Sequence, residues 1–143
     1  MLTMIQLDRM HKCASLLIIA LACIVIASCV KKDEESSKYK KQIENQAALL
    51  NKKCPIKEEP GVLTSVTFAN DTLLYHISVT DEELVRIDLD KNRQKTIETS
   101  TEKLKISLIK GKCCLTKRWV APNDSSAITI LPSEFGNIES KEK

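Results

Sequence analysis

The chain has 143 residues, and its 22 basic and 19 acidic side chains leave a formal net charge of +3. This length fits one domain, and the interspersed charges with only 3% aromatic residues give no support for a nucleic-acid-binding surface. Three glycines and two histidines are too few for a phosphate-cradling loop or a histidine-based metal site, so we expect no cofactor and no metal.

An unbroken apolar run, Leu16 to Cys29, dominates the N-terminus. Basic residues precede it and small residues end it, which is the composition of a secretory signal. Its last four residues, Ile26, Ala27, Ser28 and Cys29, resemble a bacterial lipobox, in which small residues give the lipid-modifying and cleaving enzymes access to the cysteine. The resemblance implies that residues 1–28 are a signal peptide and that Cys29 becomes the lipidated first residue. Acyl chains such as palmitate would then hold the protein on the membrane.

The alternative interpretation of this run is a single transmembrane helix. The apolar stretch from Ala14 to Val30 is 17 residues, at the lower end of what spans a bilayer. A spanning helix does not require small residues before a cysteine, so we favour the lipoprotein interpretation. A basic residue follows Met10 closely, which leaves the start codon open between Met1 and Met10.

Residues 29–37 are polar and are predicted to form a tether between the lipid and the domain. Within them, Lys32 to Glu35 resembles the lysine-plus-acidic export signal of surface lipoproteins in the Bacteroidetes. The sequence therefore predicts an envelope location at the outer membrane. It leaves open whether the protein occupies the cell surface or the periplasmic leaflet.

The first element of the domain is predicted to be an amphipathic helix from Lys38 to Lys52. Its apolar stripe is Tyr39, Ile43, Ala47 and Leu50. The steps of four, four and three residues place this stripe on one helical face, which is normally core. Ser36 or Ser37 could cap the helix, and Pro55 prevents its continuation.

A β-hairpin is predicted next, from Val62 to Ala69 and from Leu73 to Thr80. Apolar residues alternate in both runs, and Asn70 with Asp71 forms the turn between them. This pattern places His76 on the polar face, where a lone histidine is usually a surface residue.

The following segment carries two conflicting signals. Thr80 to Glu83 has the spacing of a helix capping box, yet the apolar residues after it alternate as in an extended chain. We interpret the segment as extended and expect a second helix to begin near Asp90 and to end near Gly111. Its apolar face would be Ile97, Leu104 and Leu108.

A second pair of strands completes the predicted domain, from Cys113 to Ala121 and from Ala127 to Leu131, with a turn at Pro122 to Asp124. Residues 134–143 have no pattern and are predicted to be a flexible tail. The domain thus spans residues 38–133. The predicted fold class is α+β, with two helices packed on an antiparallel sheet of about four strands in the order α-β-β-α-β-β.

Three of the six cysteines remain after the signal is removed and Cys29 is lipidated: Cys54, Cys113 and Cys114. A disulfide from Cys54 to either of the other two would close a loop of about 60 residues, worth roughly 4 kcal/mol of stability. The alternative is that all three are reduced and buried.

Several short motifs resemble a group of small bacterial lipoproteins of unknown function that is common in Bacteroidetes. They are NKKCPI at Asn51 to Ile56, Leu63, TLLY at Thr72 to Tyr75, a basic helix and a terminal strand pair. The similarity covers Gln46 to Phe135, and the chain departs from the pattern at Lys57 to Pro60. The resemblance implies an α+β domain and supplies no catalytic residues.

These observations favour a non-enzymatic, lipid-anchored binding or accessory module that contacts another envelope protein or an external ligand. A second hypothesis is a cysteine-dependent enzyme, with Cys54 or Cys114 as the nucleophile and His76 as the base. No CxxC motif or glycine-rich loop accompanies these residues. A third hypothesis is an immunity or inhibitor protein that guards the envelope.

Overall fold

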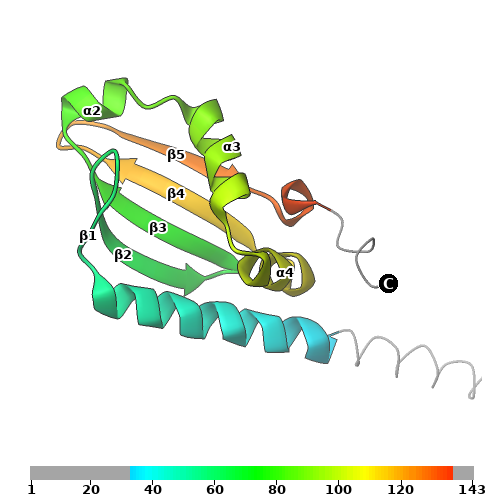
Figure 1. Ribbon diagram of the computed structural model, residues 1–143. Helices are drawn as coiled ribbons and strands as arrows, with labels where there is room; N and C mark the ends of the chain where they lie inside the picture. Colours follow the sequence, from blue (N-terminus) through cyan, green and yellow to red (C-terminus); the bar gives the residue numbers. More distant parts are fainter. Residues whose placement is uncertain (1–32, 137–143) are drawn as a thin grey trace, which may run out of the picture. The chain divides into compact units, whose positions relative to one another are not determined.

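A five-stranded sheet organises the fold, with the strands in the order β1-β2-β3-β4-β5 (Figure 1). The computed structural model describes residues 33–136, so the lipobox, Cys29 and residues 137–143 lie outside the described range. The strands are β1 (Ile56–Lys57), β2 (Val62–Ala69), β3 (Thr72–Ser78), β4 (Cys114–Val120) and β5 (Ser125–Ile130). The helical elements are a helix over residues 33–53, α2 (Asp81–Val85), α3 (Leu89–Thr99), α4 (Glu102–Gly111) and the 3-10 helix η1 (Pro132–Phe135).

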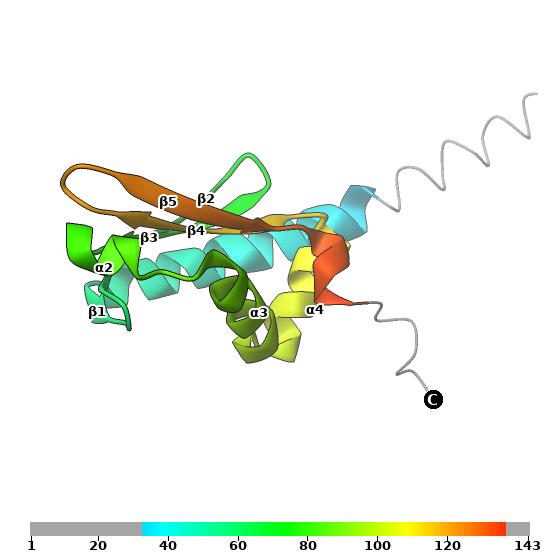
Figure 2. The same ribbon diagram turned by 90° about the horizontal axis from the view of Figure 1, so that it is seen from above.

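The α+β class is confirmed, but the sheet is larger than predicted and mixed. The two-residue strand β1 adds a fifth strand, and β3 pairs with β4 in parallel, whereas the other pairs are antiparallel. A parallel pair cannot be joined by a tight turn, so the chain needs a crossover, which α2, α3 and α4 provide. In Figure 2, these helices and the helix of residues 33–53 lie on one side of the sheet.

The hydrophobic core lies between the sheet and these helices. Its largest side chains with less than 2% exposure are Trp119, Ile43, Leu73, Ile77, Leu108, Leu115 and Ile130. The predicted stripe of the first helix is confirmed, because Ile43 and Ala47 are buried there. Within the described range, no helix is long and apolar enough to cross a membrane.

The first helix begins earlier than the apolar pattern indicated. Residues 33–37 are already helical, so Ser36 is not a cap and instead donates a hydrogen bond to the Gly111 carbonyl at 3.2 Å. At the other end, the helix stops at residue 53, two residues before Pro55, as expected.

The hairpin of β2 and β3 is confirmed. Asn70 and Asp71 adopt positive φ angles of 50° and 56°, which a two-residue hairpin turn requires and which these residue types tolerate. One irregularity interrupts the register, since Thr64 is an extra residue on β2 that bulges between the Leu63 and Ser65 pairs.

The extended interpretation of residues 81–87 was wrong. The capping box forms: the Thr80 side chain accepts from the Glu83 N–H at 3.2 Å, and the Glu83 carboxylate accepts from the Thr80 N–H at 2.8 Å. These two hydrogen bonds stabilise the first turn of α2, although the apolar residues alternate as in a strand. The alternation gave a wrong prediction because it assumed that its apolar residues share a buried face, whereas Val85 is 87% exposed.

The second predicted helix is divided into α3 and α4. Ser100 is extended, and Thr101 caps α4 by accepting a hydrogen bond from the Leu104 N–H. Threonine and serine compete for backbone hydrogen bonds, which favours caps over helix interiors and explains the break. α4 ends at Gly111 as expected, with Lys112 in the left-handed conformation.

The side of the sheet opposite the helices is not covered by any element of residues 33–136, and we call it the open face (Figure 2). Strand alternation and register assign to it Lys57, Val62, Thr64, Ser65, Thr67, Ala69, Thr72, Leu74, His76, Ser78, Cys114, Thr116, Arg118, Val120, Ser125, Ala127 and Thr129. His76 lies on this face, as the strand pattern predicted. The final strand pair is also confirmed as antiparallel.

Replacing Ile43 by alanine tests the packing of the first helix on the sheet. Ile43 is fully buried, so Ile43→Ala is expected to cost roughly 2–5 kcal/mol in the free energy of unfolding, measured by urea denaturation. Leu49→Ala, in the same helix but 61% exposed, is the control and should change stability by less than about 0.5 kcal/mol. Equal losses for both would contradict this packing.

Candidate functional site

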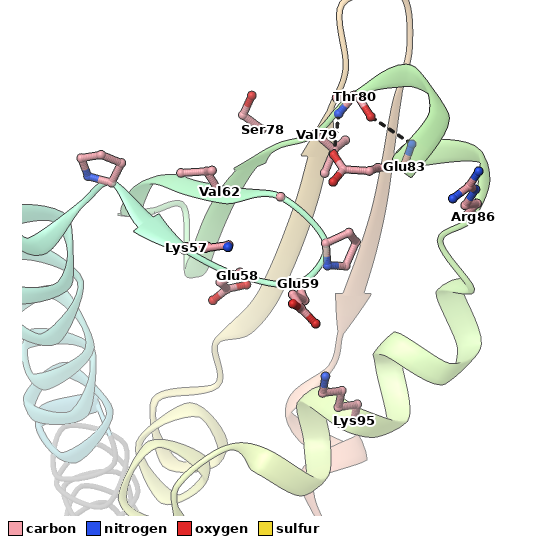
Figure 3. Close-up of a pocket in the computed structure, with 13 residues that line it drawn as sticks. Lys57, Glu58, Glu59, Val62, Ser78, Val79, Thr80, Glu83, Arg86 and Lys95 are labelled. Carbon is pink, nitrogen blue, oxygen red and sulfur yellow. Dashed lines mark hydrogen bonds between the residues drawn. The ribbon is translucent and has the colours of Figure 1, made fainter.

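A cleft of about 1100 Å³ opens on the helix side of the sheet, between the loop of residues 57–61 and the helices α2 and α3 (Figure 3). It is lined by Pro55, Lys57, Glu58, Glu59, Pro60, Gly61, Val62, Ser78, Val79, Thr80, Glu83, Arg86 and Lys95. A second hollow of about 260 Å³ shares Glu58, Glu59 and Lys95 with it and reaches Lys117 and Trp119 on β4. Together they form one candidate site, which we call the loop–helix cleft.

The loop that forms one wall is held in place by Gly61. This residue has a φ of +96°, and a side-chain Cβ there would lie 2.3 Å from the Ser78 carbonyl oxygen and 2.6 Å from Val79 Cγ1. Only glycine fits so close to the end of β3. The Glu58 N–H donates to the Gly61 carbonyl at 3.0 Å and closes the loop, so the wall has a defined position.

The deep part of the cleft is the second hollow, which is lined mainly by polar side chains and reaches Trp119 on β4. Trp119 is 1% exposed, and Lys117 lies beside it with its Nζ 6.0 Å from the centre of the Tyr75 ring. Burial raises the pKa of Tyr75 to about 12, and the negative charge of Glu58 adds to this rise. The phenol is therefore neutral at physiological pH, and Lys117 brings a positive charge to the deep end of the cleft.

The two walls carry opposite charges. Glu58 and Glu59 project from the loop, and Lys95 projects from α3 toward it (Figure 3). Within the described residues, no ion pair links these glutamates to Lys95 or Lys117, so their charges can pair with a ligand. Glu83 is less available to a ligand than Glu58 and Glu59, because its carboxylate already accepts a hydrogen bond from the Thr80 N–H.

The larger hollow combines apolar lining residues, such as Pro55, Pro60 and Val79, with charged ones, a mixture that is typical of protein-binding surfaces. The loop–helix cleft is open and at the upper end of the volumes typical of small-molecule pockets, which favours a polypeptide segment over an enclosed small ligand. Opposite charges on its walls would orient such a segment and give specificity.

The cysteines do not form the disulfide that the sequence predicted. Cys54, Cys113 and Cys114 are all free thiols, so the predicted disulfide from Cys54 is not formed. Cys113 and Ile43 both lie against Gly111, whereas Cys54 follows Ile43 by eleven residues, about 16 Å along a helix. A disulfide requires Cα atoms within about 7 Å. Burial raises the pKa of the Cys113 thiol to about 11, so it is protonated and unreactive at neutral pH.

The structure also separates the candidate nucleophiles from His76. Cys54 donates its thiol hydrogen to the Leu50 carbonyl at 3.4 Å on the helix side of the sheet, while His76 is on the open face. Cys114 shares that face, but it pairs with Thr72, four residues from His76, or about 13 Å along the strand. Neither thiol is within the hydrogen-bond reach that a nucleophile and its base need.

Sequence reasoning missed the cleft. The sequence patterns predicted no role for Glu58, Glu59 or Lys117. The signal in the sequence was the spacing of proline and glycine. Pro55 precedes the two glutamates, and Pro60 and Gly61 follow them, which is typical of a fixed loop. In the described part of the chain, no group of three or more His, Cys, Asp or Glu side chains is placed to hold a metal ion.

The sequence matches no known protein family and no curated protein. Two solved structures are similar to it. The pilotin of the Vibrio vulnificus type 2 secretion system has a TM-score of 0.60 at 8% identity, covering 73% of this chain and 98% of the pilotin. A candidate secreted protein of Pseudomonas aeruginosa also has a TM-score of 0.60, at 16% identity, covering 71% of this chain and 96% of that protein. At these identities the likeness shows a shared fold.

Titration of Tyr75 tests the electrostatics of the cleft. We expect a tyrosinate absorbance transition with a pKa of about 12 that Tyr75→Phe removes. Because the folded-state pKa lies above the ordinary value of about 10, the stabilisation is complete below about pH 10 and is lost as the pH rises toward 12. Glu58→Gln should lower this pKa, and Glu59→Gln is the control. An unchanged pKa in Glu58→Gln would contradict the placement of Glu58.

Proposed function

We propose that this chain is a lipid-anchored, non-enzymatic accessory protein of the bacterial envelope, and that it binds a segment of another envelope protein in the loop–helix cleft. The observation that carries the proposal is the cleft itself, with a partly apolar lining, a loop fixed by Gly61 and oppositely charged side chains on its two walls that have no ion pair across them in the described residues.

The anchor part of the proposal rests on the sequence. The lipobox-like residues 26–29 predict lipidation of Cys29, and three residues separate Cys29 from the first described helical residue. Even fully extended, three residues span only about 10 Å. The tether would thus hold the start of the domain near the membrane, where envelope proteins are the available partners. We propose the outer membrane as the location.

The fold is consistent with such a role. A pilotin of a secretion system and a candidate secreted protein have the same arrangement of elements over most of their length. We propose that this chain, whose fold is similar to that of a pilotin from a type 2 secretion system, binds a protein of the envelope and performs no chemistry on a substrate. The separation of His76 from both candidate thiols removes the geometric basis of the enzyme hypothesis.

The anchor is tested by Cys29→Ala in the full chain. Without the thiol no lipid can be attached, so we expect the protein to become soluble or to remain unprocessed, as measured by membrane fractionation and intact mass. Cys54→Ala is the control and should leave the protein on the membrane. Membrane retention of Cys29→Ala at the mature mass would refute the lipid anchor.

The cleft is tested by a photo-crosslinking amino acid at Glu59 in the full chain in living cells. We expect an adduct with an envelope protein, and Lys95→Glu should weaken it about tenfold, the effect of roughly 1.4 kcal/mol, because it reverses the charge of one wall. Lys91→Glu makes the same change elsewhere on exposed α3 and is the matched control. Equal adducts in the two variants, or none in the unaltered chain, would contradict cleft binding.

A further inference from the structure

The open face differs from the rest of the surface in its chemistry. On β2, β3, β4 and β5 none of its positions is lysine, aspartate or glutamate, although charged residues make up 29% of the chain; Lys57, on the edge strand β1, is its one lysine among the described residues. Hydroxyl and small apolar side chains occupy it, with Val120 41% exposed and Thr67 also exposed. Water-facing surfaces usually carry lysine and glutamate, whereas the centres of protein interfaces are depleted of lysine, aspartate and glutamate and retain arginine.

One arginine stands in the middle of this face. Arg118 lies on β4 between β3 and β5, in register with His76 on one side and Ala127 on the other. Its side chain is exposed, and no carboxylate in the described range pairs with it within 4.0 Å. His76 is half-buried beside it and adds a second nitrogen-bearing side chain. The centre of the open face thus offers an exposed guanidinium donor that has no acidic partner among the described residues.

We propose that the open face is a second docking surface, and that its occupant is a different protein that presents a flat, weakly charged surface with a carboxylate opposite Arg118. An arginine pairs with a carboxylate through two parallel hydrogen bonds, which fixes both position and orientation. The surrounding threonine, serine and valine side chains can pack against a flat partner without burying an unpaired charge.

A second copy of this chain is the poorer occupant. Two open faces packed about 10 Å apart around a two-fold axis would bring the central Arg118 side chains of both copies together without an intervening carboxylate. Charge complementarity therefore selects an acidic partner over self-association.

This surface is distinct from the loop–helix cleft, because the sheet lies between Arg118 and the cleft residue Lys95 (Figure 2). Among the described residues, the two surfaces share only Ser78 at the end of β3 and its neighbours in register, Val62 and Lys57. The two sites can be occupied at once by different proteins. The chain would then be an adaptor that holds two envelope components on opposite sides of one small sheet.

The test places a photo-crosslinking amino acid at Thr67 of the full chain in living cells. We expect an adduct with a different protein, reduced tenfold or more by Arg118→Glu and reduced less by Arg118→Lys, which keeps the charge but not the two parallel hydrogen bonds. Lys91→Glu, a charge reversal of an exposed basic residue on α3, is the control and should leave the adduct unchanged. The crosslinked segment of the partner should contain Asp or Glu, and changing that residue to Arg should restore the adduct with Arg118→Glu.

Three outcomes would overturn the proposal: no adduct from Thr67, an adduct with the mass of two copies of this chain, or an adduct that Arg118→Glu leaves intact. If Arg118→Glu reduces the amount of folded protein, Ala127→Glu adds a negative charge beside Arg118 and should give the same loss. The cleft proposal and the open-face proposal are tested by different adducts, so the failure of one can be told from the failure of the other. Lys95→Glu should weaken the Glu59 adduct and leave the Thr67 adduct unchanged.

Discussion

The parallel pairing of β3 with β4 is the constraint on which the rest of the structure depends. Seven residue pairs, from Thr72 with Cys114 to Ser78 with Val120, join the two halves of the sheet. Parallel neighbours need a long connection, and connections of this kind pack on one face of the sheet with a fixed hand. The crossover through α2, α3 and α4 therefore covers one face only, and the two faces of the sheet become chemically different.

The helices do not cover their face of the sheet uniformly. On the covered face, α3 is mostly polar and contributes little to the core, since Thr96 is its one fully buried residue in the described range. A helix that packs so lightly leaves space above the sheet, and the loop of residues 57–61 closes that space on its other side. The cleft is thus a consequence of a crossover helix that lacks a wide apolar stripe.

Local patterns predicted what depends on local interactions. The β2–β3 turn at Asn70 and Asp71 and the core stripe around Ile43 follow from backbone preference and periodicity, which neighbouring residues determine. Strand β1 has only two residues, too few to show an alternating pattern. The β3–β4 pairing joins segments that are far apart in the chain, so no short stretch of sequence contains both strands. The cleft was missed for the same reason, because Glu58 and Lys95 are brought together only by the crossover.

The crossover also determines the order in which the sheet can assemble. Each hairpin closes through a short turn, but β3 and β4 meet only after the 35 residues 79–113 are looped back, at an entropic cost on the order of 3 kcal/mol. The hairpins β2–β3 and β4–β5 can therefore form before the complete sheet. During that interval the inner edges of β3 and β4 are unpaired. Each can add a strand from another nascent chain, so aggregation competes with folding until the crossover is in place.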